Sequence, residues 1–136
     1  MAQVSGDHFV ITVLTAPRPP AALVCLAGEI DMDAHPALSG VVDRLSAVAP
    51  TEVVVDLADV TFASSTLLNF LARAHVTLTA DTALVVCRPR HHIRRLLEMT
   101  NVGKLVTMRG DLPPSGYWMP HGAARSDDLP VLGGID

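Results

Sequence analysis

Aromatic residues are scarce in this sequence. Phenylalanine, tyrosine and tryptophan make up only 4% of its 136 residues, whereas apolar residues as a whole make up 49%. A core must therefore be built mainly from Val, Leu, Ile and Ala, and a chain of this length fits one domain. No apolar run approaches the roughly 18 residues that a membrane-spanning helix needs. Residues 1–7 also lack the basic-then-apolar pattern of a secretion signal. We therefore expect a cytoplasmic protein with no membrane partner.

Cysteine and net charge are also low. Cys25 and Cys87 each lie inside an apolar, strand-like run, which is typical of reduced core thiols in a cytosolic protein. The net charge is −4 with neutral histidines, which argues against nucleic acid as the main partner.

The common patterns of enzyme sites are missing. The six histidines do not cluster at metal-ligand spacing, and the adjacent His91 and His92 would point about 100° apart on a helix. No HExxH, CxxC, Walker or GxGxxG pattern is present. Ser64 and Ser65 lack the flanking glycines of a hydrolase elbow. We expect no enzyme, cofactor or metal. A small enzyme or carrier that binds an anion at a helix start is the alternative from another class.

The most informative stretch covers residues 52–71. Val53–Leu57 is a β-branched run without a solvent face, which predicts a strand buried on both sides. Apolar residues at helical spacing follow from Leu67. Between the two lie three consecutive hydroxyl residues, Ser64, Ser65 and Thr66. Such hydroxyls can cap the free amides of a first helical turn, and an anion there would meet the positive end of the helix dipole.

The remaining elements alternate along the chain. Strands are predicted at residues 8–14, 22–27, 53–57 and 83–87, and helices follow the last three of them. Residues 104–108 fit either a short strand or the end of a helix. The order β-β-α-β-α-β-α predicts a single α/β domain. Its mixed, mostly parallel sheet would have four to five strands, with the helices mainly on one face.

Particular residues predict the boundaries of these elements. Three prolines within residues 17–20 should separate the first two strands, and residues 28–33 should form a turn. Asp33 is predicted to cap the first helix, with Pro36 in its first turn, and Ala49–Pro50 to end it. Gly103 suits a left-handed helix end. The role of Asp31 stays open, and the basic side of the helix that follows Pro89 could be solvated or could bind an acidic partner or phosphates.

The chain changes character at its C-terminal end. Residues 109–136 have no periodicity and are rich in Pro, Gly and Asp, which predicts a flexible tail after a domain at residues 8–108. Tyr117–Met119 is the apolar point of this tail. It could dock on the domain or on a partner.

Four stretches share their order and spacing with a known family. They are Leu26–Asp31, Val53–Phe62, Ala63–Thr66 and Arg94–Val102. Together they resemble the STAS domain family, specifically its bacterial anti-sigma factor antagonists, over about residues 9–108. The resemblance implies a STAS fold and a non-enzymatic regulator of transcription without a cofactor.

The resemblance also implies a mechanism of partner switching. An unphosphorylated antagonist of this kind binds an anti-sigma factor with a histidine-kinase-like ATPase fold and so releases the sigma factor. The anti-sigma factor then phosphorylates a serine of the antagonist, and the phosphate breaks the complex. By alignment the acceptor here is Ser65, with Ser64 as the alternative. The implied partner-binding residues are Glu29, Asp31, Ala63, Ser64 and Thr66, on a monomer or weak dimer.

The chain departs from the family pattern in the loop itself. The family has Asp-Ser-Ser-Gly where this sequence has Ala63, Ser64, Ser65 and Thr66. A carboxylate and a flexible glycine are thereby replaced. The alternative is therefore a STAS module that binds its partner constitutively, or acts as a scaffold, without phosphorylation.

Overall fold

A computed structural model describes residues 3–17, 20–78, 80–110 and 119–120 of the chain. The strands are β1 (Gln3–Ser5), β2 (Phe9–Pro17), β3 (Pro20–Ile30), β4 (Glu52–Ala63), β5 (Ala83–Cys87), β6 (Thr107–Arg109) and β7 (Met119–Pro120). The helices are α1 (His35–Val48), α2 (Ser65–Thr77) and α3 (His91–Glu98), with short 3-10 helices η1 (Met32–Ala34) and η2 (Asn101–Lys104).

The strands form one mixed sheet in the order β1-β2-β3-β4-β5-β6, and β7 pairs with β2. β1, β2, β3 and β7 pair antiparallel, whereas β3, β4, β5 and β6 pair parallel. The predicted fold class is therefore confirmed. The sheet has more strands than the four to five expected, because β1, β6 and β7 are too short to show a pattern of their own.

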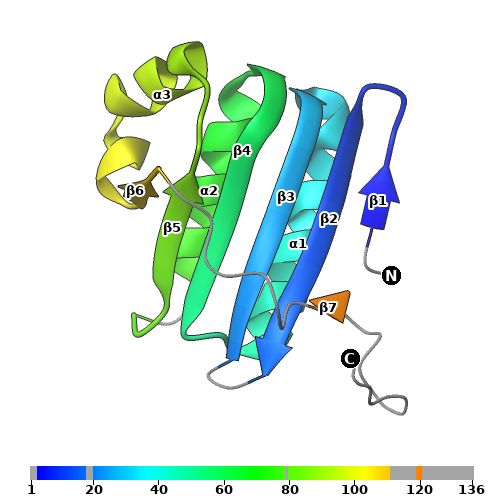
Figure 1. The fold of residues 1–136 in the computed structure, drawn as a ribbon, viewed down its shortest axis with the longest axis vertical. Coiled ribbons are helices and arrows are strands. Elements are labelled where there is room, and N and C mark those ends of the chain that lie inside the picture. Colours follow the sequence, from blue (N-terminus) through cyan, green and yellow to red (C-terminus); the bar gives the residue numbers. More distant parts are fainter. Residues whose placement is uncertain (1–2, 18–19, 79, 111–118, 121–136) are drawn as a thin grey trace.

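Helices α1 and α2 lie side by side on one face of the sheet, and α3 lies at one end beside β5 (Figure 1). The buried residues of α1 recur at helical spacing, and those of α2 do the same. They pack against alternate residues of the strands, including Val53, Val55 and Leu57 of β4. The helices thus cover the main core, as the sequence predicted.

Two strand boundaries differ from the prediction. Pro17 and Pro20 are the last paired residues of the β2–β3 hairpin, so the ladder accepts prolines at its end. β3 also continues through the predicted turn as far as Ile30, with irregular register near Gly28. Gly28 has φ +87°, and a Cβ there would collide with the backbone oxygen of His8. Glycine is therefore required at this bend.

Two predicted helix caps are wrong, namely Asp33 before α1 and Gly103 after α3. Asp33 does not cap α1: Asp31 caps η1 instead, and Ala34 precedes α1 without a side-chain cap. Pro36 does lie in the first turn of α1. The predicted end of α1 at Ala49–Pro50 is confirmed, since the helix runs to Val48 and Ala49 is its left-handed C-cap, with φ 52°.

The backbone of Gly103 is not left-handed. Among the described residues, the glycine with positive φ is Gly28. Gly103 lies inside η2, where a Cβ would collide with the carbonyl oxygen of Leu97. Close packing, and not backbone conformation, explains this glycine. Residues 104–108 were compatible with a short strand or with the end of a helix. They contain the end of the 3-10 helix η2 and the start of strand β6.

The predicted tail contains two described segments. Arg109 belongs to β6, and Met119–Pro120 pairs with Leu14 and Thr15 of β2. Residues 111–118 and 121–136, with Tyr117 and Trp118 among them, lie outside the described residues. The flexibility of the tail therefore stays a prediction.

Candidate functional site

The hydroxyl-rich loop and the turn after β3 lie at the same end of the sheet. β3 and β4 run parallel, and their last paired residues are Ile30 and Ala63. Asp31 and Ser64 directly follow these partners. The backbone N–H of Ser64 donates to the carbonyl oxygen of Ile30 at 3.1 Å, which ties the two connections together.

Ser64 is the N-cap of α2. Its backbone is extended, and its Oγ accepts a hydrogen bond from the N–H of Thr66 at 3.2 Å. The same hydroxyl makes a long contact, 3.5 Å, with the carbonyl oxygen of Ile30. A capping role for one of the three hydroxyls is thereby confirmed, and it falls to Ser64.

The neighbours of Ser64 differ sharply in exposure. Ser65 is the first residue of α2, and it is exposed to solvent. Thr66 is buried, and it is not among the residues with positive φ. Ala63 is half-buried and packs against the main core. The replacement of the family's glycine by Thr66 therefore strains no backbone angle, and Ser65 presents the exposed hydroxyl.

The two acidic candidates have different surroundings. The Oδ1 atom of Asp31 accepts the backbone N–H of Asp33 at 3.2 Å, so this half-buried carboxylate holds the turn in shape. Glu29 is exposed and lies opposite Phe62 in the β3–β4 ladder. The family resemblance implies that both residues lie near the loop, whereas the sequence alone does not decide the role of Asp31.

Two exposed apolar side chains beside the loop were not predicted. Met32 is 82% exposed and Phe62 is 50% exposed. Met32 follows Asp31, and Phe62 precedes Ala63, so both border the loop. Large apolar side chains at such exposure are informative when they gather beside polar candidates. The sequence signal that could have revealed them was a large apolar residue inside the predicted turn and another beside the run of hydroxyl residues.

Helix α3 supports the end of β4. Arg90 donates from Nε to the carbonyl oxygen of Ala58 at 3.0 Å. The Nε2 atom of His92 lies 3.0 Å from the carbonyl oxygen of Thr61, and it must carry the proton because a carbonyl only accepts. Part of the basic side of α3 thus binds the protein's own backbone. Arg94 pairs with Glu98 on the same helix.

A second polar feature lies on the face of the sheet away from the helices. Arg88 binds the carboxylate of Asp56 through Nε to Oδ1 at 3.2 Å and Nη2 to Oδ2 at 2.7 Å. Arg88 has φ 53°, and the hydrogen bond to Asp56 raises its pKa. The sequence does not predict this pair, because Asp56 lies within an otherwise apolar strand.

The two cysteines flank Asp56 on the neighbouring strands, opposite it in both ladders. β4 separates Cys25 from Cys87, and neither forms a disulfide within the described part of the chain. Burial raises the pKa of Cys25 to about 11, with a smaller contribution from the charge of Asp56. Burial also raises the pKa of Cys87. Both groups are therefore thiols at neutral pH.

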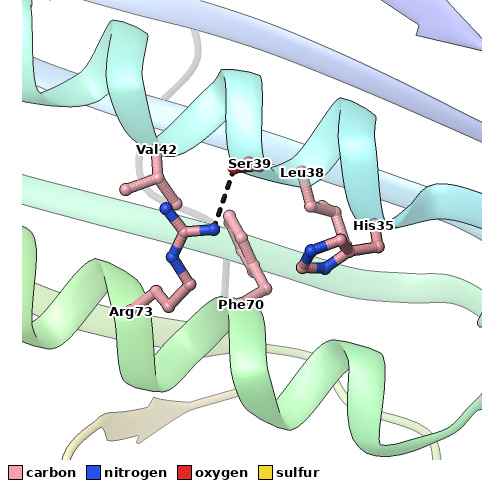
Figure 2. A pocket seen from close by; sticks show the side chains of 6 residues that line it. All are labelled: His35, Leu38, Ser39, Val42, Phe70 and Arg73. Atoms are coloured by element: carbon pink, nitrogen blue, oxygen red, sulfur yellow. Dashed lines mark hydrogen bonds between the residues drawn. The ribbon is translucent and has the colours of Figure 1, made fainter. Parts of the chain in front are cut away.

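In residues 3–17, 20–78, 80–110 and 119–120, no three potential metal-ligating side chains gather. A shallow groove between α1 and α2 is bridged by Arg73, whose Nη1 donates to the Oγ of Ser39 at 2.8 Å (Figure 2). Leu38, Val42 and Phe70 line it together with His35. This groove is the contact line between two packed helices.

Among the helices that the structure describes, none is long and apolar enough to cross a membrane.

Comparison with protein families matches residues 15–107 to the family model described as Mlab, STAS domain (STAS_2). The chain belongs to the STAS domain family. Among solved structures it is similar to an anti-sigma factor antagonist from Mycobacterium paratuberculosis, with 31% identity and a TM-score of 0.65. That match covers 75% of this STAS chain and 87% of the other.

A second similar structure is the anti-sigma factor antagonist SpoIIAA in its unphosphorylated form. It shares 15% identity with this STAS chain, with a TM-score of 0.60, over 74% of this chain and 89% of the other. At that identity the likeness concerns the fold alone. A comparison with curated proteins finds no match. Family and fold are those of anti-sigma factor antagonists.

Proposed function

We propose that this STAS protein is a non-enzymatic anti-sigma factor antagonist of the cytoplasm. It binds an anti-sigma factor with a histidine-kinase-like ATPase fold, and phosphorylation of Ser65 by that partner breaks the complex. The proposal rests on one observation. The exposed Ser65 is the first residue of α2, and the preceding Ser64 already caps this helix.

The different roles of the two serines favour Ser65 as the acceptor. A phosphate on Ser64 would remove the cap hydroxyl and crowd the carbonyl oxygen of Ile30, at 3.5 Å from Oγ. A phosphate on Ser65 would meet solvent and the positive end of the α2 dipole. Modification at Ser65 therefore leaves the fold intact and changes the surface.

The surface around Ser65 suits a protein partner. Met32 and Phe62 offer apolar area on either side of the loop, and Glu29 adds a charge next to Phe62. A few side chains that become buried in the centre of an interface contribute most of its binding energy. We assign the anchoring contacts to Met32 and Phe62. Asp31, Ala63 and Ser64 shape the loop, and the buried Thr66 supplies no more than its backbone.

The switch follows from the charge of the phosphate. A phosphoserine carries about −1.5 to −2 charges at neutral pH. At Ser65 this charge would enter an interface that also contains the carboxylates of Asp31 and Glu29. Burial of the phosphate beside these two carboxylates would cost desolvation and like-charge repulsion that solvent relieves in the free protein, which weakens binding.

One observation favours the alternative of constitutive binding. Ala63 stands where the family has an aspartate beside the serines, so a carboxylate that could orient the acceptor is missing. The two functions differ only in the fate of Ser65. The same experiment therefore separates them.

The experiment is affinity capture from host lysate with and without ATP, followed by mapping of phosphorylated residues. We expect an ATPase-fold protein to bind, and to leave as phosphate appears on Ser65. Ser65→Ala should abolish labelling, whereas the matched variant Ser64→Ala should keep it. Capture of the same partner without phosphorylation would establish constitutive binding. Absence of any ATPase-fold partner would refute both functions.

The anchoring contacts need a test of their own. Met32→Ser and Phe62→Ser should each weaken partner binding by about tenfold or more, from the 1–2 kcal/mol or more that an interface anchor contributes. The matched control is Val76→Ser, because Val76 is 80% exposed near the other end of α2. Equal affinities for all three variants would refute this interface.

A further inference from the structure

Strand β4 carries a bulge just before the hydroxyl-rich loop. Gly28 of β3 pairs with Val60, and the next residue, Glu29, pairs with Phe62. β3 therefore advances by one residue where β4 advances by two, and the additional residue of β4 is Thr61. Bulges of this kind are frequent beside functional sites, where they redirect a side chain.

The burial of β4 shows the consequence of this bulge. Val60 is buried in the main core, and Ala63 packs against the same core. In a regular strand, two residues separated by three positions would point to opposite faces of the sheet. Here both reach the core, and the two residues between them, Thr61 and Phe62, are exposed.

The orientation of Phe62 depends on the additional residue. In a regular register Phe62 would pair with Ile30, which is fully buried in the main core. Paired residues of neighbouring strands share a face, so the ring of Phe62 would then point toward the helices. The bulge instead pairs Phe62 with the exposed Glu29 and turns its ring toward solvent.

Helix α3 supplies a hydrogen-bond partner for this bulge. β5 pairs with β4 as far as Asp56, and beyond that point no strand of the described residues pairs with this edge of β4. The carbonyl oxygen of Thr61 lies instead 3.0 Å from Nε2 of His92, in the first turn of α3. A side chain thus takes the place of a strand partner.

A second bulge of β4 is bound in the same way. One additional residue lies between Asp56 and Asp59, because β3 advances by two residues there and β4 by three. The carbonyl oxygen of Ala58, inside this bulge, accepts a hydrogen bond from Nε of Arg90 at 3.0 Å. Both bulges of β4 therefore have a carbonyl group bound by the segment that contains Arg90 and His92.

We infer that His92 is a positioning residue for Phe62, because its hydrogen bond to Thr61 stabilises the bulge that turns this ring outward. The inference rests on the proposed function, in which Phe62 anchors the partner, and it adds the residue that keeps the anchor exposed. His92 acts through the carbonyl oxygen of Thr61 and not through a contact of its own with the partner. Loss of one such bond changes the population of the ordered bulge by a factor of about two to ten.

Hydrogen exchange in the free protein tests this role without any partner. The N–H of Ser64 donates to the carbonyl oxygen of Ile30 at 3.1 Å directly after the bulge, so its exchange rate reports on the order of this segment. In His92→Ala this N–H should exchange about two- to tenfold faster. His92→Gln carries an N–H donor at a similar distance from the backbone and should restore slow exchange.

Two references make the exchange experiment specific. The matched variant His91→Ala removes the neighbouring exposed imidazole and should exchange like the unmodified protein. The N–H of Val55, in the centre of β4, should keep its rate in His92→Ala. Equal exchange of Ser64 in His92→Ala and the unmodified protein would overturn the inference. Faster exchange at Val55 as well, or no restoration by His92→Gln, would reduce His92 to a general contributor to stability and overturn it too.

A double-variant cycle on the affinity for the captured anti-sigma factor tests whether His92 acts through Phe62. His92→Ala should weaken binding by about two- to tenfold in the unmodified background, and it should have no further effect in the Phe62→Ser background. An equal loss in both backgrounds would place His92 in contact with the partner and contradict the inference. If no ATPase-fold partner is captured, the proposed function fails, and the hydrogen exchange of the free protein still decides whether His92 holds the bulge.

Discussion

The two members of the Asp56–Arg88 pair should contribute unequally to stability. The side chain of Asp56 is 8% exposed, whereas that of Arg88 is 42% exposed. Arg88→Ala leaves a carboxylate in a buried site, with the N–H of Ala58 at 3.2 Å as its remaining donor within the described part of the chain. Uncompensated buried charges cost about 3–5 kcal/mol, and partial solvation of this pair favours the lower end, about 3 kcal/mol.

The reverse substitution should cost less. In Asp56→Ala the guanidinium of Arg88 can turn into solvent, so the loss is that of hydrogen bonds to a charged group, at the lower end of about 1.5–3 kcal/mol. The double variant leaves no buried charge unpaired. It should therefore be more stable than the sum of the two single effects predicts, by about 0.5–3 kcal/mol.

Urea denaturation of the two single variants and the double variant measures these free energies of unfolding. We expect Arg88→Ala to be the more destabilising of the two single changes, by about 1 kcal/mol or more. If Asp56→Ala costs as much as Arg88→Ala, or if the two changes are additive, the carboxylate is not the buried member of the pair and the argument fails.

Three further predictions concern single residues. Ser64→Ala should lower the free energy of unfolding by about 1 kcal/mol through loss of the α2 cap, as measured by urea denaturation. Gly28→Ala should cost more than about 2 kcal/mol, because the left-handed angle adds to a collision with the oxygen of His8. The pKa of about 11 for Cys25, against 9.0 for a free thiol, reduces its thiolate fraction about 100-fold below pH 9. Alkylation should therefore be slow at pH 8 and should accelerate about tenfold per pH unit up to about pH 11.

Each of these predictions has a control. Ser65→Ala removes an exposed hydroxyl outside the cap and should change stability by less than about 0.5 kcal/mol. An equal loss in both serine variants would exclude Ser64 as the specific cap. Gly40→Ala should stabilise by about 0.5–1 kcal/mol, because a Cβ there meets nothing within 4 Å in α1. A neutral Gly28→Ala would contradict the structure of the bend. Rapid alkylation at pH 8 would contradict the burial of Cys25.

The existence of the main elements was predictable because each has a local cause. Consecutive β-branched residues at Val53–Val55 favour a strand, and α1 repeats its buried residues at helical spacing. The length of β4 was not predictable from such patterns. Beyond Leu57 its exposed residues look like a loop, and it stays extended because β3 pairs with it and α3 holds its carbonyl groups. These partners lie about 30 residues away in the chain.

The site was predictable in composition but not in the roles of its residues. Three hydroxyls before an apolar helix indicate a cap, yet the choice of Ser64 depends on the carbonyl oxygen of Ile30, which lies on another strand. Asp31 and Asp33 are equally good caps by residue type, and the 3-10 helix Met32–Ala34, which begins directly after Asp31 and includes Asp33, decided for Asp31. The Asp56–Arg88 pair requires the order of the strands, which no local pattern contains.

The most direct test of the proposed switch is the affinity of the captured anti-sigma factor for this protein with and without phosphate on Ser65. Repulsion and desolvation at an interface cost several kcal/mol, so the phosphorylated form should bind about 100-fold more weakly or worse. Ser65→Ala should bind like the unmodified protein with ATP present or absent. Equal affinity of the two forms would contradict the switch and leave this protein as a constitutive binder.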